Sequence, residues 1–310
     1  DIKADGAMTA LLKDAINPNL VQTLEGTPAF IHGGPFANIA HGTNSIIATR
    51  LALSLADYVV TETGFASDLG AEKFFDIVVR TGQVPAPAAC VLVSTLRALK
   101  YHGGVKIAEL PNENPKAVEA GFDNLKKHIE NLKIFGVPFV VALNLFPADH
   151  QSEIKLWTEL IKEEKARYAL SDVYNQGGEG GLELAAEVMK AMSEDKTNFQ
   201  FLYPADQPLL KKVEAIALKI YGADGVKVET GARKKIELYE QLGLSSLPVC
   251  VAKTQASLSD DSKKIGRPRG WNLTLTNASL SSGAGFVVVH CGDIMTMPGL
   301  PKAPAAEKID

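Results

Sequence analysis

Two histidines and a pair of glycines are the residues of this chain best suited to hold a reacting ligand. His32 is followed at once by Gly33 and Gly34, and His41 comes nine residues after His32. Neighbouring glycines let backbone amides approach a phosphate or a carboxylate, and a helix that begins nearby adds a favourable field for an anion. We interpret the segment as a ligand site, although a histidine hydrogen-bonded for purely structural reasons gives the same pattern.

The segments on either side must position these residues. An apolar run, residues 28–31, ends at His32, and apolar residues then recur at helical spacing from Ile46 to Leu55. A second apolar run follows at residues 57–61, so the pattern predicts a strand, a helix and a second strand in succession. Because the carboxyl ends of parallel strands open on the same crevice, we expect the loops after the two strands to meet there.

The loop after the second run carries an aromatic residue, Phe65, between Gly64 and Ala66. An aromatic side chain at such a loop tip provides a stacking surface or fills a gap in the core, and the residue types leave both readings open. Charged residues surround it and are expected at a solvated helix start, where the helix dipole favours acids: Glu62, Asp68, Glu72 and Lys73.

Two more aromatic residues stand at the ends of apolar runs. Phe146 and Pro147 follow the run 139–145, and Tyr174 precedes a glycine-rich loop at residues 175–181. Aromatic rings at neighbouring strand ends could clamp a flat heteroaromatic ring, and a place in the core is equally compatible with them. Glycines beside a strand end are typical of a functional loop.

A basic segment near the C-terminal end of the chain is a further candidate. Lys253 follows the buried run 247–252, and Arg267 and Arg269 come shortly afterwards. An anion site or a solvated loop would both fit this pattern.

Composition narrows the class of protein. The 310 residues carry a net charge of -4 with scattered cations, which argues against nucleic acid as a partner. No run of eighteen apolar residues and no signal-peptide pattern occurs, so no membrane partner is expected and we predict a cytoplasmic location. The three cysteines are isolated, and no spacing suggests a metal site.

Apolar runs and helical patterns alternate along most of the sequence. This alternation predicts an α/β fold with mainly parallel strands. No GxxxxGK[ST] sequence occurs in the 310 residues, so these residues cannot supply a phosphate-binding loop of the Walker type.

Several longer motifs resemble those of the formate–tetrahydrofolate ligases, also called 10-formyltetrahydrofolate synthetases. The likeness runs from end to end and is nearest to the bacterial monofunctional type. It is carried by GTPAFIHGGPFANIAHGTNSIIAT, DYVVTETGFASDLGAEKFFD, LRALKYHGG, FGVPFVVALNLFPADHQSEI, GGEGGLELA, LPVCVAKTQASLSDD and GRPR.

The resemblance implies a reaction. ATP phosphorylates formate, and the formyl phosphate is attacked by the amine at position 10 of tetrahydrofolate, giving 10-formyltetrahydrofolate, ADP and phosphate. ATP with Mg²⁺ would be a co-substrate, and a monovalent cation is a further candidate. A homo-oligomer, a tetramer in the family, is also implied.

The resemblance also implies a domain organisation. Family members extend further at the N-terminus, where their Walker-type loop lies, so this chain is expected to be a C-terminal portion. Residues 1–124 would be part of a large domain of the P-loop NTPase kind, followed by smaller α/β domains at 125–224 and 225–310. A separate N-terminal half or a truncated enzyme would explain this, and the chain alone is expected to be inactive.

Site residues follow by matching motif positions. His32, with Gly33 and Gly34, would be catalytic. Phe65 and Pro147 would line the folate pocket, and Phe146 would form one face of an aromatic clamp around the pterin. Tyr174 would form the other face, where the bacterial family usually has tryptophan, and its smaller ring offers less contact area. A folate-binding or regulatory module without catalysis is the alternative.

Overall fold

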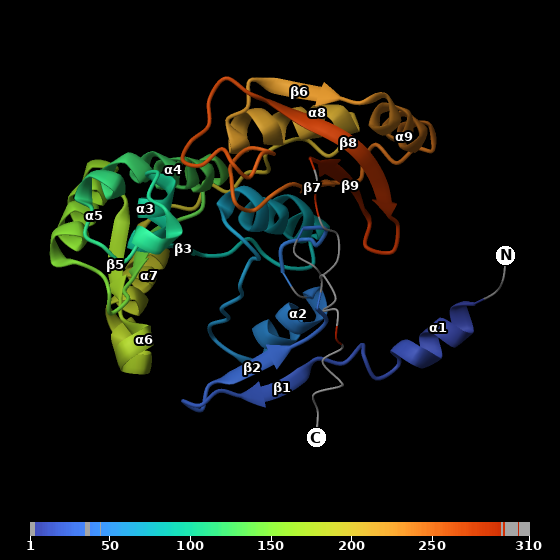
Figure 1. The fold of residues 1–310 in the computed structure, drawn as a ribbon. Helices are drawn as coiled ribbons and strands as arrows, with labels where there is room; N and C mark the ends of the chain where they lie inside the picture. Colours follow the sequence, from blue (N-terminus) through green and yellow to red (C-terminus); the bar gives the residue numbers. More distant parts are fainter. Residues whose placement is uncertain (1–3, 35–37, 44, 293, 295–302, 304–310) are drawn as a thin grey trace.

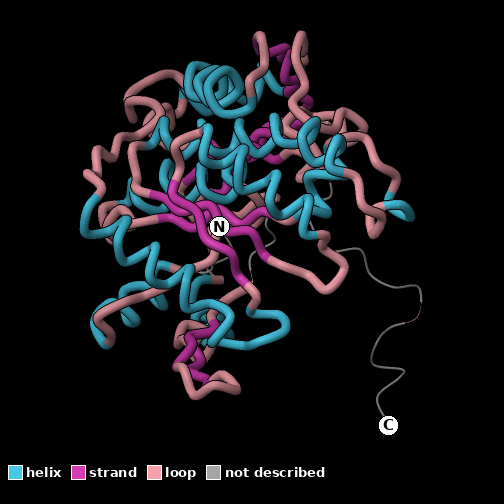
Figure 2. Tube along the Cα trace, turned by 90° about the vertical axis from the view of Figure 1, so that its left-hand side faces the viewer, coloured by secondary structure: helices cyan, strands magenta, loops and turns pink. Residues whose placement is uncertain are grey.

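The computed structural model describes residues 4–34, 38–43, 45–292, 294 and 303. Within them, strands form a two-stranded, a three-stranded and a four-stranded sheet, with helices packed against them (Figures 1 and 2). Residues 35–37 and 44, which belong to the motif around His32, lie outside the described residues.

The three-stranded sheet, here called the parallel sheet, has the order β3-β4-β5. The central strand is the most buried, because it has a neighbour on each side and α7 packs on it. Helix α4 packs on β3, and α5 and α7 pack on β5. The elements are β3 (Cys90–Ser94), β4 (Phe139–Asn144), β5 (Arg167–Ser171), α4 (Pro115–Phe135), α5 (Gln151–Glu163) and α7 (Leu182–Glu194).

Local sequence explains where the long helix α4 begins and ends. The side chain of Asn114 accepts a hydrogen bond from the amide of Ala117 at 3.1 Å, and Pro115 occupies the first turn. Gly136 ends the helix in a left-handed conformation with φ of 69°. The buried apolar face between them includes Phe122 and Ile129, so α4 is anchored to the main core.

The four-stranded sheet, here called the mixed sheet, has the order β6-β8-β9-β7. Strands β6 and β8 are parallel, as are β9 and β7, whereas β8 and β9 are antiparallel. Helices α8 and α9 pack against it (Figure 1). The elements are α8 (Leu209–Ala215), η6 (Ile216–Tyr221), β6 (Gly225–Val228), α9 (Thr230–Gln241), β7 (Val249–Ala252), β8 (Asn272–Ser281) and β9 (Phe286–Cys291).

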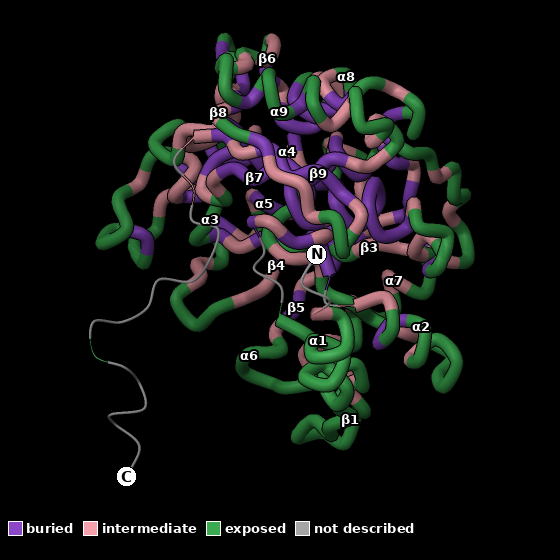
Figure 3. Tube along the Cα trace, turned by 90° about the vertical axis from the view of Figure 1, so that its right-hand side faces the viewer, coloured by how far each residue is buried: buried purple, intermediate pink, exposed green. Residues whose placement is uncertain are grey.

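The N-terminal part is the most exposed. Strands β1 and β2 form an antiparallel hairpin, and α2 packs on β2. Figure 3 shows exposed residues over α1, β1 and α2, while buried residues gather around α4, β7 and β9. The elements are α1 (Asp5–Leu12), β1 (Asn19–Gln22), β2 (Pro28–Ile31) and α2 (Ile46–Leu55).

A buried segment of short helical turns links the hairpin region to the two larger sheets. It comprises η1 (Ser67–Ala71), η2 (Phe74–Val78) and η3 (Val79–Thr81). Phe75 of η2 packs against Phe135 of α4 with ring centroids 4.5 Å apart. The remaining short elements are α3 (Leu96–His102), η4 (Ile107–Glu109), α6 (Val173–Gln176) and η5 (Gly177–Gly181).

The predicted α/β class is confirmed, with one fully parallel sheet and one mixed sheet. The strand at 28–31 and the helix at 46–55 are confirmed as β2 and α2. The strand predicted at residues 57–61 is wrong, because that segment pairs with no strand in the described structure and Val60 is exposed. The parallel arrangement expected around His32 is wrong too, since β2 pairs antiparallel with β1.

The domain division at 124/125 and 224/225 stays a prediction. The first boundary falls inside α4, and the second falls between η6 and β6. Among the described residues, none of the helices has the length and apolar character needed to cross a bilayer.

Candidate functional site

Phe146 and Tyr174 come together at the carboxyl edge of the parallel sheet. Asn144 at the end of β4 pairs with Ser171 at the end of β5, and each aromatic residue follows its strand by two or three positions. Their ring centroids lie 5.8 Å apart and their planes are tilted by 45°. The side chains are 37% and 68% exposed, so the pair stands at the surface rather than in the core.

The rings are too close together to hold a third ring between them. Stacked carbon atoms prefer separations of about 3.5 Å, so a sandwiched ligand requires roughly 7 Å between the flanking rings. The two side chains therefore contact each other directly, with their rings tilted. Tyr174 is the more exposed of the two and is the ring that has room to move.

Backbone and carboxylate contacts fix the loop after β4. The amide of Phe146 donates to Oδ2 of Asp149 at 2.9 Å. Burial raises the pKa of Asp149, while the bond from the Phe146 amide opposes that rise. Pro147 lies exposed next to Phe146, so it presents its ring on the same edge.

The glycine-rich loop after β5 is held from two directions. Asp172 accepts hydrogen bonds from the side chains of Asn175 and Gln176, each at 2.6 Å. The amide of Gly178 donates to the carboxylate of Glu25 in the β1–β2 turn at 2.7 Å. This contact spans 153 residues and brings the tip of the N-terminal hairpin to the carboxyl edge of the parallel sheet.

His32 is held by two hydrogen bonds within the N-terminal part. Its Nε2 lies 2.9 Å from the carbonyl oxygen of Ala15, and its Nδ1 lies 2.6 Å from Oγ of Ser45. A carbonyl oxygen only accepts, so Nε2 carries a proton, and a neutral ring then accepts the hydroxyl proton of Ser45 at Nδ1. Ser45 in turn caps α2 by accepting from the amide of Ala48 at 3.0 Å.

The glycines after His32 are exposed. Gly33 adopts a left-handed conformation with φ of 64°, which an L-residue with a side chain adopts at a cost. A Cβ added at Gly34 would meet nothing within 4 Å among the described residues. The hydrogen bonds of His32 in the described structure run to Ala15 and Ser45, and neither joins it to Phe146 or Tyr174.

Phe65 occupies a strained position beside His41's loop. Its φ is 67°, a left-handed conformation unusual for a bulky residue, and its side chain is 42% exposed. The amide of Gly64 donates to the carbonyl of Gly42 at 3.2 Å, and the hydroxyls of Thr43 and Thr61 lie 2.9 Å apart. The two polar loops thus meet as expected, through these hydrogen bonds rather than through parallel strands.

The charged residues after Phe65 are buried, contrary to the prediction of a solvated helix start. Asp68, Glu72 and Lys73 are all 4% exposed or less. The prediction is wrong because the segment is packed between α4 and the mixed sheet, where Lys253 forms an ion pair with Asp68 at 2.8 Å. Sequence offered one signal for this pair, the position of Lys253 at the end of an apolar run.

Burial and countercharge compete at Asp68. Burial alone would raise the pKa of its carboxyl, but Lys253 and His128 outweigh that effect and hold the pKa below its ordinary value. Burial also lowers the pKa of His128, whose Nδ1 lies 2.8 Å from Oγ of Ser67. This network is fully internal, so we assign it to stability.

Glu72 differs from Asp68 because its carboxylate has no hydrogen-bond partner among the described residues. Both carboxylate oxygens are buried without a hydrogen-bond partner in the described part of the chain. Burial, reinforced by the neighbouring charge of Asp76, raises the pKa of Glu72 well above its ordinary value. The carboxyl therefore stays protonated to a higher pH than an exposed glutamate does.

In the basic segment near the C-terminal end, for which the sequence leaves an anion site and a solvated loop both open, the cations Lys253, Arg267 and Arg269 are paired with acids of the chain. Lys253 forms its ion pair with Asp68, and Arg267 pairs with Glu130 at 2.7 Å. Arg269 pairs with Asp123 at 3.2 Å. The two arginines tie the segment to α4, and Lys253 ties it to η1.

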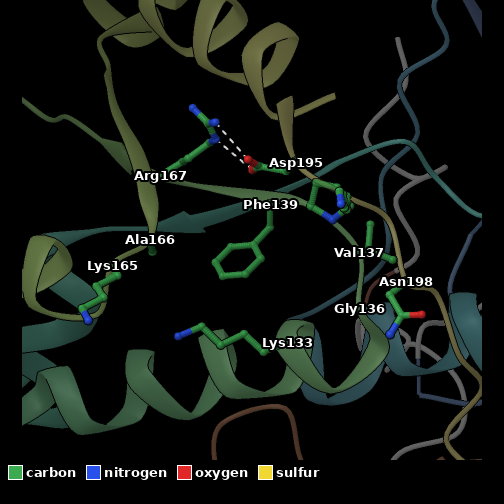
Figure 4. Close-up of a pocket in the computed structure, with 11 residues that line it drawn as sticks. Lys133, Gly136, Val137, Phe139, Lys165, Ala166, Arg167, Asp195 and Asn198 are labelled. Carbon is green, nitrogen blue, oxygen red and sulfur yellow. Dashed lines mark hydrogen bonds and ion pairs between the residues drawn. The ribbon is translucent and has the colours of Figure 1, made fainter. Parts of the chain in front are cut away.

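Two cavities border the parallel sheet. One of about 480 Å³ opens at the amino edge, opposite Phe146 and Tyr174 (Figure 4). Arg167 at its wall is held by Asp195, with Nε to Oδ2 at 2.8 Å, so its charge is already compensated. The second cavity, of about 320 Å³, lies beyond the end of β3.

The fold defines an α/β protein with a pair of exposed aromatic rings at the carboxyl edge of a parallel sheet, the usual place for ligands in such folds. The family of formate–tetrahydrofolate ligases has a model that matches residues 1–310. The chain therefore belongs to the formate–tetrahydrofolate ligase family. This family carries out ATP-dependent ligation of formate to tetrahydrofolate, in one-carbon metabolism.

Proposed function

We propose that this chain supplies the folate-facing part of that ligase reaction. Formate would be activated as formyl phosphate, and the amine at position 10 of tetrahydrofolate would attack the formyl carbon. The new C–N bond forms as the C–O bond to phosphate breaks, and the amine proton is released. Formate, ATP with Mg²⁺ and tetrahydrofolate are then the small-molecule partners.

The aromatic pair carries the proposal. Phe146 and Tyr174 are exposed, adjacent and placed at strand ends on loops that other side chains hold. In our proposal Tyr174 moves outwards to widen the gap between the two rings, and the pterin ring stacks between Phe146 and Tyr174, with Pro147 beside Phe146. Phe65, held in its strained conformation, adds a second apolar surface. Stacking supplies position rather than bond chemistry.

His32 would act on the formyl group. When the amine attacks, negative charge develops on the formyl oxygen, and donors aimed at that oxygen lower the barrier. The Nε2–H of His32 now points to the carbonyl of Ala15 and would have to exchange that partner for the substrate. The amides of Gly33 and Gly34 are the additional donors we assign.

We further propose that a phosphate-binding loop is supplied from outside these residues, since no GxxxxGK[ST] sequence occurs among them. An N-terminal region, on a separate polypeptide or in a longer form of the same enzyme, would provide it, and the 310 residues alone would bind folate without turnover. A homotetramer, a monovalent cation and a cytoplasmic location are further expectations. A folate-binding module without catalysis is the competing function, favoured by the same missing motif.

One experiment separates these possibilities. Tetrahydrofolate binding is measured by calorimetry, and ligase activity is assayed with and without a polypeptide that carries the phosphate loop. Binding together with activity only in the mixture supports our proposal. Binding without activity in either case supports the module, and robust activity of the 310 residues alone contradicts the need for an external loop.

A further inference from the structure

The second cavity is lined by residues that have no role in the pterin site proposed at Phe146 and Tyr174. It is an open surface cavity of about 320 Å³, and its wall is largely apolar, with one guanidinium. Ile107 at its rim is 65% exposed, although it is a large aliphatic residue. The lining residues are Thr95, Arg97, Ala98, Tyr101, Ile107 and Leu110.

This cavity lies on the same edge of the parallel sheet as the aromatic pair. Ser94 at the end of β3 pairs with Leu143 of β4, so the residues that follow both strands emerge side by side. The far wall is tied to the loop that carries Phe146. Nε2 of His150, four residues after Phe146, lies 3.1 Å from the carbonyl oxygen of Pro111, next to Leu110.

The strand order implies a short distance between the cavity and the two aromatic rings. Neighbouring strands are about 4.8 Å apart, and the rings follow β4 and β5 while the cavity follows β3. A ligand whose flat head lies at the rings therefore needs to cross only one or two strand spacings to enter the cavity. Nothing in the order of the strands places another strand between them.

Arg97 is the only charged group that lines the cavity among the described residues. It is exposed, and no carboxylate in the described structure lies within ion-pair distance of it. A guanidinium presents two parallel N–H groups that match a carboxylate. The cavity is thus suited to an apolar ring that bears a carboxylate at its far end.

We propose that this cavity holds the p-aminobenzoyl-glutamate part of tetrahydrofolate, with Arg97 pairing with a glutamate carboxylate. The inference rests on the proposed folate site and extends it. The benzoyl ring lies against Ile107, Leu110 and Tyr101, while the pterin remains at Phe146. Arg97 then distinguishes folates from pterins that lack glutamate.

The test compares two ligands on the full chain by calorimetry: tetrahydrofolate and tetrahydropteroate, which lacks the glutamate. Arg97→Met is expected to weaken tetrahydrofolate about five- to tenfold, as loss of a charge-assisted pair would, and to leave tetrahydropteroate unchanged. Arg97→Lys should fall in between, because it keeps the charge and loses the paired donors. Arg233→Met, an exposed arginine of α9, is the matched control.

Each outcome decides a different claim. If wild type binds neither ligand, the proposed folate site fails and the inference fails with it. If wild type binds both and Arg97→Met changes neither affinity, or changes both equally, the folate site stands and the role of Arg97 is refuted. Circular dichroism of the variants excludes unfolding as the cause.

Discussion

The rings of Phe146 and Tyr174 lie against each other, with centroids 5.8 Å apart, and so occupy the space that a pterin would need. A ligand that enters must replace this contact with its own. Tyr174 sits in a four-residue helix followed directly by glycines, so its ring can move with little cost to the core. We infer that binding is coupled to a local rearrangement of residues 173–181.

The buried pair of Lys253 and Asp68 should dominate the stability of the central segment. Lys253→Met leaves a charged carboxylate without its partner inside the protein, which costs about 3–5 kcal/mol. Urea unfolding followed by circular dichroism measures this loss. The double variant Asp68→Asn/Lys253→Met should lose less than the single change, because no charge is left uncompensated. A double variant as unstable as the single one would contradict an electrostatic origin.

Glu72 should make stability fall as pH rises. Its pKa is raised in the folded state, so the unfolded chain ionises first, near the ordinary value of 4.5. Above that pH, ionisation of Glu72 stabilises the unfolded state alone. The free energy of unfolding of wild type therefore falls until the pH reaches the pKa of Glu72 in the folded state. Glu72→Gln lacks this loss and should be more stable than wild type at pH 7, with an advantage that shrinks towards pH 4. Unfolding curves with equal pH dependence for both proteins would show that Glu72 is not the group responsible.

Two substitutions of Phe65 separate the effect of backbone strain on stability from the effect of the aromatic ring on ligand affinity. Phe65→Ala keeps a Cβ at φ 67°, whereas Phe65→Gly removes the steric conflict and should be more stable than the alanine variant by about 1 kcal/mol. Both variants lose the ring, so both should bind tetrahydrofolate more weakly by a similar factor. Thermal unfolding and calorimetry report the two effects separately. Wild-type affinity in both variants would remove Phe65 from the site.

His32 should affect turnover more than affinity. His32→Ala removes a donor proposed for the developing oxyanion, so turnover should fall about 10²-fold under conditions in which wild type is active. The dissociation constant of tetrahydrofolate should change less than threefold. His290→Ala, in β9, serves as the histidine control, because His290 bonds Ser279 inside the mixed sheet. A parallel loss of affinity would indicate a role in binding instead.

Some elements depend on signals that are local in the sequence. Asn114, Pro115 and Gly136 mark both ends of α4, and glycines mark the loop after β5. The placement of Phe146 and Tyr174 at neighbouring strand ends followed from the order of runs, and the structure brings the two rings together.

The remaining features depend on contacts between distant residues. The run 57–61 is apolar enough for a strand, but a strand also needs a hydrogen-bonding neighbour, which the described structure does not give it. Asp68 and Lys253 lie 185 positions apart, so no local pattern reveals that each is buried against the other. The contact of Glu25 with Gly178 was likewise invisible in sequence.

The affinity of Tyr174→Ala for tetrahydrofolate tests the central claim most directly. Tyr58→Ala, a tyrosine of similar exposure in the 57–60 segment, is the matched control. By calorimetry, Tyr174→Ala should weaken binding by about 1–3 kcal/mol, the range for losing one stacked aromatic face, and Tyr58→Ala should not. Wild-type affinity in Tyr174→Ala would contradict the assignment of Phe146 and Tyr174 as the folate site.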